Sequence, residues 1–236
     1  MNRYHVQSNL LDPLENNGQM ILVIGEDWDV FHARLFLCSK VNNEWQVVQN
    51  FPAVCGQNGM AWGLGVYPQN PESQPQPTKK EGDQKTPVGI FHLGTCMGYA
   101  SKPLNPNLPY QPLTVTMEGV DDPLSRHYNQ VVNKAKLSEG IEVDWKSYEV
   151  MRREDALYKW LMIIEHNPDN LPGAGSLIFL HIWENDKKGT AGCTAVASKN
   201  MEEILTWLDP NQNPVVVQLP RPLYHQFAAE WGLPTL

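Results

Sequence analysis

The chain has 236 residues, of which 42% are hydrophobic and 19% are charged, and its formal net charge at pH 7 is −8. This length and composition predict a globular protein with one large domain rather than a disordered chain. The acidic balance argues against broad electrostatic binding to nucleic acid or anionic lipid. No apolar run approaches the roughly 20 residues that span a bilayer, and residues 1–17 lack the basic and apolar regions of a signal peptide.

The first part of the chain predicts a run of short strands. Residues 20–25 form a β-branched run that ends in glycine, which is typical of a buried strand. Segments 33–39 and 45–50 lie on either side of the turn-forming Asn-Asn pair at 42–43, so they predict a hairpin. Residues 51–56 are expected to continue the same sheet.

Residues 68–84 are rich in Pro, Gln, Lys and Glu, a composition that predicts an exposed, mobile loop. Strand-like segments lie on both sides of it, so we interpret it as an insertion within one domain rather than a linker. The short basic pairs at 79–80, 152–153 and 187–188 are expected to lie on solvated surface.

The rest of the chain predicts four more strands and two helices. The strands are expected at 88–94, 113–118, 161–165 and 215–219. Residues 97–112 carry four prolines and are expected to be irregular. The apolar side chains of residues 146–160 are spaced as on an amphipathic helix.

The second helix is predicted to start at Ser198, a good N-cap residue, and to end at Asp209-Pro210. Glu202 and Glu203 are expected in its first turn, where negative charge favours the helix dipole. Its apolar face is formed by Met201, Ile204, Leu205 and Leu208.

Together these elements predict a mostly-β fold with two to three helices in one domain. The domain is expected to span residues 20–219, with an N-terminal extension at 1–19 and a C-terminal tail at 220–236. The sequence holds no internal repeat.

The residues most typical of chemistry lie in the last third of the chain. An apolar run at 176–180 leads into His181, and a short loop then reaches Gly192 and Cys193. A cysteine thiol has a reference pKa of about 8.5 and is a weak nucleophile until a neighbouring base takes its proton. A glycine beside the sulfur lets a substrate carbonyl approach backbone N–H groups. The pattern indicates a cysteine acyl-transfer site, although single histidines and buried cysteines are also common in ordinary cores.

The remaining cysteines, Cys38, Cys55 and Cys96, form no C-x-x-C pair, and no histidine lies at zinc-finger spacing. No structural zinc site, other metal or cofactor is therefore expected. The pair Asp121-Asp122 before Pro123 is more typical of an Asx-turn than of a metal ligand set.

Three sequence blocks resemble the L,D-transpeptidase catalytic domain family, which has the YkuD-type fold. Residues 85–91 (Lys-Thr-Pro-Val-Gly-Ile-Phe) resemble its Thr-Pro-x-Gly-x-Phe element. His181 followed by residues 190–193 (Thr-Ala-Gly-Cys) resembles its His…[Ser/Thr]-x-Gly-Cys motif. The segments between them that are similar to a longer branch of this family are 121–123, 128–129, 166–167 and 173–176.

The resemblance implies a YkuD-like β-sandwich that acts on peptidoglycan stem peptides in the periplasm or cell envelope. Cys193 would attack the carbonyl of the third, diamino-acid residue of the stem and expel the terminal D-alanine. An amine from another stem then captures the thioester to give a 3→3 cross-link, whereas water gives L,D-carboxypeptidation. His181 would be the base, and the backbone N–H groups of Gly192, Cys193 and Thr194 would form the oxyanion hole.

Other candidate residues have two interpretations. Thr190 is a candidate for substrate binding or for stabilising its own turn. His166 and Asn167 follow an expected strand and are candidates for facing the cleft. Trp183 lies two residues after His181, hence on the same strand face, and is expected to pack beside the imidazole.

The chain departs from the family pattern on both sides of the cysteine. Ala191 stands where relatives often carry histidine, and Thr194-Ala195 stand where they often carry Arg or Asn. Three functions therefore stay open: an L,D-transpeptidase, an L,D-carboxypeptidase or amidase on the same stems, and a catalytically weak peptidoglycan-binding module. The sequence does not indicate an oligomeric state.

Overall fold

The computed structural model describes residues 13–66, 77–137 and 143–236. The strands are β1 (Gln19–Gly25), β2 (His32–Val41), β3 (Glu44–Val54), β4 (Met60–Trp62), β5 (Thr86–Gly98), β6 (Tyr110–Pro112), β7 (Met117–Val120), β8 (Gln130–Asn133), β9 (Tyr148–Val150), β10 (Trp160–Ile164), β11 (Phe179–Ile182), β12 (Thr194–Val196) and β13 (Val215–Pro220). The α-helices are α1 (Ser198–Trp207) and α2 (Arg221–Phe227), and short 3-10 helices lie at Lys134–Lys136 and Pro210–Gln212.

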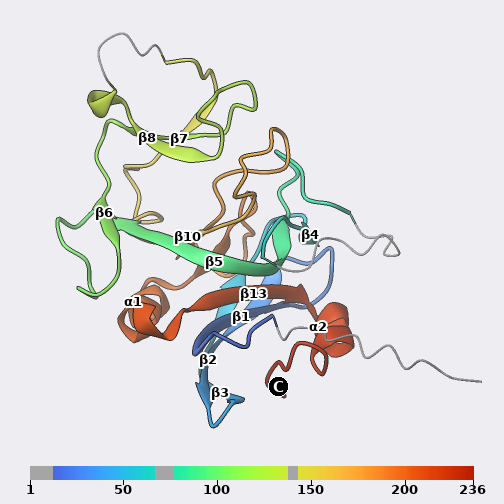
Figure 1. The fold of residues 1–236 in the computed structure, drawn as a ribbon. Helices are drawn as coiled ribbons and strands as arrows, with labels where there is room; N and C mark the ends of the chain where they lie inside the picture. Colours follow the sequence, from blue (N-terminus) through green and yellow to red (C-terminus); the bar gives the residue numbers. More distant parts are fainter. Residues whose placement is uncertain (1–12, 67–76, 138–142) are drawn as a thin grey trace, which may run out of the picture.

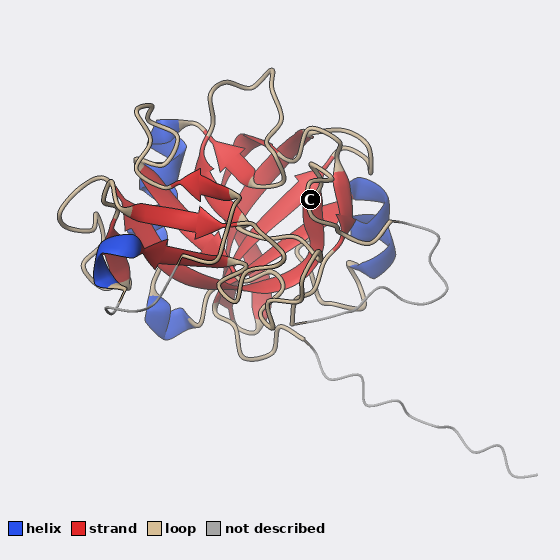
Figure 2. Ribbon diagram, turned by 90° about the horizontal axis from the view of Figure 1, so that it is seen from above, coloured by secondary structure: helices blue, strands red, loops and turns tan. Residues whose placement is uncertain are grey.

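The fold is mostly β, as predicted, and its large sheet closes on itself into a sandwich with a barrel-like path. The strand order is β10-β11-β12-β3-β2-β1-β13-β5, and the pairing of β5 with β10 completes the ring. Strands β4 and β6 pair with β5 outside this ring, while β8, β7 and β9 form a separate small sheet. Figure 1 shows the small sheet apart from the large one, with α1 and α2 at opposite ends of β13. In Figure 2 the helices lie around the periphery of the strands.

The centre of the large sheet confirms the strongest strand predictions. Every residue of β1 is buried because β1 lies between antiparallel β2 and parallel β13. The strand expected at 215–219 is present as β13, which lies in the middle of the sheet and is buried throughout. A continuous apolar run is what a strand covered on both faces requires.

The predicted hairpin is also confirmed. Strands β2 and β3 pair antiparallel along their length, and the turn between them is Asn42-Asn43. Both asparagines have positive φ, 51° and 65°. Two successive residues with positive φ form the turn whose twist matches a hairpin, and asparagine tolerates that conformation better than most residues.

The helix expected at 146–160 is wrong. Residues 148–150 form β9, which pairs with β7, and turns lead from there to β10. Tyr148 and Val150 are 46% and 50% exposed while Glu149 between them is half-buried, which is the two-residue alternation of a strand. The apolar residues that suggested one helical face serve two separate cores, since Met151 and Trp160 belong to different clusters.

The apolar face of α1 is confirmed, but its predicted cap is wrong. Met201, Ile204 and Leu205 are buried against the core. The helix is capped at Ala197 without a side-chain hydrogen bond, so Ser198 is already helical, and no acidic residue lies in the first turn. No element was predicted after residue 220, yet α2 buries apolar side chains there, including Leu223 and Phe227. Neither described α-helix has the length and apolar content needed to cross a membrane.

The expected exposed loop at 68–84 is corrected in its second half. Residues 67–76 lie outside the described residues, so the mobility predicted there stays a prediction. Thr78 bridges to Trp62, and Lys79 is only 4% exposed. The basic pair at 79–80 is therefore not wholly on the surface, because one of its lysines packs inside the molecule.

Candidate active site

Two neighbouring parallel strands bring the predicted cysteine and histidine together. In the register of β11 with β12, His181 lies opposite Ala195, and Leu180 lies opposite Thr194. Cys193 immediately precedes β12, so it falls two residues from Ala195 and on the same face of the sheet as His181. Both side chains are 7% exposed and line one cavity.

The imidazole of His181 is held in an orientation that suits a base. Its Nδ1 lies 2.7 Å from the carbonyl oxygen of Ile182. Because a carbonyl oxygen only accepts, this contact assigns the proton to Nδ1 and leaves Nε2 with a free lone pair. The ring of Tyr158 packs edge-on against the imidazole, with centroids 5.3 Å apart. Burial lowers the pKa of His181 to about 4, so the imidazole is neutral at physiological pH.

Cys193 rests as a thiol hydrogen-bonded to the backbone. Its Sγ–H donates to the carbonyl of Leu177 at 3.5 Å, and Sγ accepts the Phe179 N–H at 3.3 Å. Burial raises the pKa of the thiol to about 12, and the charge of Glu149 acts in the same direction. The sulfur therefore lines the same cavity as the imidazole, and it is protonated.

In the loop at 189–193, the N–H of Gly192 is already hydrogen-bonded, whereas the N–H of Cys193 is available to an oxyanion. The Gly192 N–H donates to the Thr190 hydroxyl at 3.1 Å, and that hydroxyl donates to the Cys193 carbonyl at 2.6 Å. Thr190 thus stabilises its own turn, the second of its two interpretations. Thr194 is fully buried, and its hydroxyl donates to Gln218 on β13. Among the described residues, the Cys193 N–H has no hydrogen-bond acceptor.

Thr86, at the start of the Thr-Pro-x-Gly element, holds the cysteine loop in place. Its buried hydroxyl accepts the Gly56 N–H at 2.8 Å and lies 2.9 Å from the Gly192 carbonyl and 3.1 Å from the Cys193 carbonyl. The sequence indicated a strand-entry turn at this point, and Thr86 does begin β5. The structure adds that this one hydroxyl joins two loops, at Gly56 and at Gly192–Cys193, to the start of β5.

Thr86→Val is expected to lower the free energy of unfolding by about 2 kcal/mol or more, because two buried backbone groups lose their partner. Thr86→Ser keeps the hydroxyl and is expected to retain most of that stability. Urea unfolding of the two variants provides the measurement. A larger loss for serine than for valine would show that the methyl group, and not the hydroxyl, holds the loop.

Cys193 stands between two cavities. The first, about 290 Å³ and here called the His181 cavity, is also lined by Trp183, Thr190 and Tyr158. The second, about 200 Å³ and here called the Gly192 cavity, is also lined by Lys79, Leu177 and Gly192. Cys193, Ala191 and Glu149 line both. A substrate that crosses the sulfur therefore meets a separate pocket on each side.

The sequence missed three residues beside the cysteine. Glu149 and Tyr158 lie in the segment that was read as a helix, and the alternation of Tyr148, Glu149 and Val150 was the signal for a strand with Glu149 turned inward. Lys79 forms a buried ion pair with Asp83, and no local pattern distinguishes it from its exposed neighbour Lys80.

His166 and Asn167 lie outside both of these cavities. Both ring nitrogens of His166 meet backbone groups, the N–H of Leu64 at 3.1 Å and the carbonyl of Ala174 at 2.9 Å. Asn167 is fully buried and hydrogen-bonds to Leu171 in both directions. These contacts favour a structural role for both side chains.

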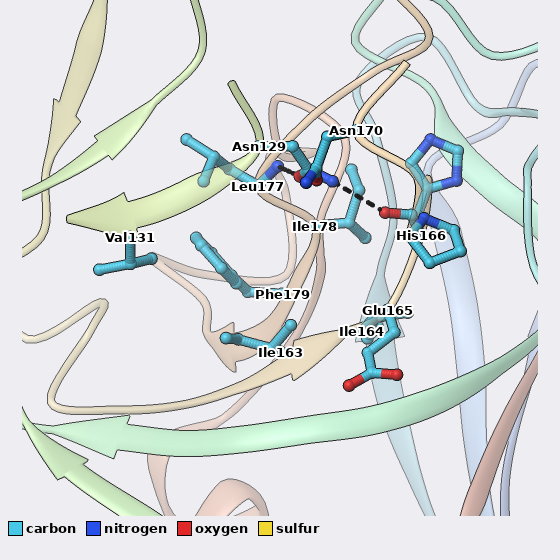
Figure 3. Close-up of a pocket in the computed structure, with 11 residues that line it drawn as sticks. Asn129, Val131, Ile163, Ile164, Glu165, His166, Asn170, Leu177, Ile178 and Phe179 are labelled. Atoms are coloured by element: carbon cyan, nitrogen blue, oxygen red, sulfur yellow. Dashed lines mark hydrogen bonds between the residues drawn. The ribbon is translucent and has the colours of Figure 1, made fainter. Parts of the chain in front are cut away.

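The loop that contains His166 and Asn167 helps to position the Leu177 carbonyl, which contacts the Cys193 sulfur. His166 lines a third cavity of about 290 Å³, in which Asn129 reaches both the His166 carbonyl and the Leu177 N–H (Figure 3). Leu177 has a φ of +53°, which is uncommon for a residue with a bulky side chain. Held in this conformation, Leu177 turns its carbonyl to the thiol of Cys193.

The domain is closed and mostly β, and it brings a buried cysteine and a neutral histidine to one cavity. Residues 33–217 match the model of the YkuD family, described as the L,D-transpeptidase catalytic domain. The match covers most of the chain, which therefore belongs to this family. A comparison with curated proteins finds no match.

Proposed function

We propose that this protein is an L,D-transpeptidase of peptidoglycan stem peptides in which Cys193 is the nucleophile and His181 the general base. The single observation that carries the proposal is their placement on one face of two adjacent parallel strands, at a shared cavity, in a member of this family. Because its substrate is the cell wall, we expect it to work in the periplasm or cell envelope.

The protonation states define how the first step proceeds. With a thiol pKa of about 12 and an imidazole pKa of about 4, the resting pair is neutral. The thiol proton moves to Nε2 of His181 as sulfur attacks the carbonyl carbon of the diamino-acid residue. The Cys193 N–H is the donor available to the oxyanion that forms.

The tetrahedral intermediate then collapses to a thioester. The bond between the carbonyl carbon and the D-alanine nitrogen breaks, and His181 gives its proton to that nitrogen. An amine of a second stem attacks the thioester carbonyl and His181 takes a proton from that amine. The new amide bond forms as the C–S bond breaks, and His181 returns the proton to the sulfur, which restores the thiol. Both amines must reach His181, so the His181 cavity serves the leaving group and the acceptor, while the Gly192 cavity serves the donor stem.

Incubation with purified disaccharide-tetrapeptide, followed by mass analysis, tests the proposal. A cross-linked dimer that has lost one D-alanine is the expected product, and the Cys193→Ala variant is the control that should yield none. Tripeptide without dimer would replace transpeptidation by carboxypeptidation. Unchanged substrate would overturn both activities and favour a peptidoglycan-binding module.

A further inference from the structure

The Gly192 cavity carries acidic side chains that the proposed reaction does not use. Glu81, Asp121 and Glu149 come from three distant segments of the chain and line the same space of about 200 Å³. The one cation that lines it, Lys79, is paired with Asp83. The Gly192 cavity, next to Cys193, therefore carries a net negative charge.

Glu149 is placed at the junction of the two cavities, beside Cys193. One of its carboxylate oxygens accepts the Tyr158 hydroxyl at 2.7 Å, and Tyr158 in turn packs against His181. The second oxygen has no hydrogen-bond partner in the described part of the chain. One oxygen of the Glu149 carboxylate is thus held by Tyr158, and the other is free to accept a hydrogen bond from a substrate.

A second, independent sign of a missing partner lies in the same cavity. Asp121 Oδ1 is a buried atom without a hydrogen-bond partner among the described residues, and Asp121 lines the Gly192 cavity. A buried polar atom left unpaired costs about 1–3 kcal/mol, so such atoms usually face a ligand or water. The neighbouring Asp122, by contrast, accepts the N–H groups of Leu124 and Lys146.

We infer that Glu149, together with Asp121, binds an ammonium group of the substrate in the Gly192 cavity. The inference rests on the proposed function, in which the attacked residue is a diamino acid whose side-chain amine extends into the donor cavity. A charge-assisted hydrogen bond from that amine to the open oxygen of Glu149 fixes the attacked carbonyl over Cys193.

An organic cation fits this cavity better than a metal ion. In the described ranges, no group of three or more His, Cys, Asp and Glu side chains is arranged to hold a metal. Burial, with the nearby charges of Asp121 and Glu81, raises the pKa of Glu149. An ammonium beside it favours the ionised carboxylate, so binding relieves the repulsion among these like charges.

Two donor peptides test the inference: the stem tetrapeptide with its side-chain amine free, and the same peptide acetylated on that amine. Turnover is measured as D-alanine release with the same unmodified stem tripeptide in excess as acceptor for both donors, and binding by calorimetry on the Cys193→Ala protein. We expect the free amine to be preferred by roughly tenfold or more in both measurements. Glu149→Gln, added to each protein, should reduce the preference to within about threefold.

Glu184→Gln is the matched control, because Glu184 is an exposed carboxylate that lines only the His181 cavity, and it should keep the full preference. Asp121→Asn is a second variant, expected to reduce the preference, should Glu149→Gln fail to fold. A preference that survives both substitutions overturns the inference even where turnover confirms the transpeptidase. A binding preference without turnover keeps the ammonium site and rejects the reaction. Equal or absent binding of the two peptides rejects the site.

Discussion

Cys193→Ala is expected to abolish thioester formation and to lower kcat by more than roughly 10⁴-fold, because loss of an enzyme nucleophile removes the covalent pathway. The fold should survive, since the substitution removes only one sulfur from a side chain that faces two cavities. Mass spectrometry after exposure to a carbapenem, which acylates the cysteine of this family, should show an adduct on the wild type and none on the variant.

Cys96→Ala is the matched control for the nucleophile. All four cysteines are free and buried, but Cys193 lines the His181 and Gly192 cavities, whereas Cys38, Cys55 and Cys96 line neither. A thiol reagent is therefore expected to label Cys193 fastest. The four cysteines differ in how easily the reagent reaches the sulfur, and not in their fraction of thiolate. A carbapenem adduct that persists in Cys193→Ala, or labelling of Cys193 no faster than of Cys38, would contradict the assignment.

His181→Ala is expected to lower kcat by roughly 10²- to 10⁴-fold, the usual contribution of a general base. The second part of this prediction concerns how the kcat/KM of the wild type depends on pH. The active form of His181 is neutral, and its pKa is lowered to about 4. The wild-type kcat/KM should therefore fall below about pH 4 and stay level through neutrality, with no rise near pH 6.5.

The ultraviolet absorbance of the thiolate gives an independent measurement on the same protein. With the pKa of Cys193 raised to about 12, no thiolate should be seen at pH 7. A thiolate signal at pH 7 that disappears in His181→Ala would instead show a preformed thiolate–imidazolium pair. That outcome would contradict the neutral resting state derived from burial.

The strands with continuous or alternating apolar patterns could be predicted from their local sequence. A continuous apolar run indicates a strand that is buried on both faces, and an alternating one indicates a strand that is buried on one face. β1, β13 and the β2–β3 hairpin are examples. The segment 146–160 could not, because its apolar residues pack into two different cores and so imitate a helical spacing. The helix α2 was missed because its burial depends in part on β1, which is distant in the chain, as well as on the adjacent β13.

The sequence by itself determined the candidate nucleophile, the candidate base and the family, because these depend on residue types in a fixed chain order. Only the tertiary structure decided the protonation states and the hydrogen bonds of these two residues. The Ile182 carbonyl sets the tautomer of His181, and the turn at Thr190 leaves the Cys193 N–H free. Burial sets both pKa values, and Glu149, from a separate sheet, lines the same two cavities as Cys193. Desolvation and convergence arise between segments far apart in the chain, so no local pattern encodes them.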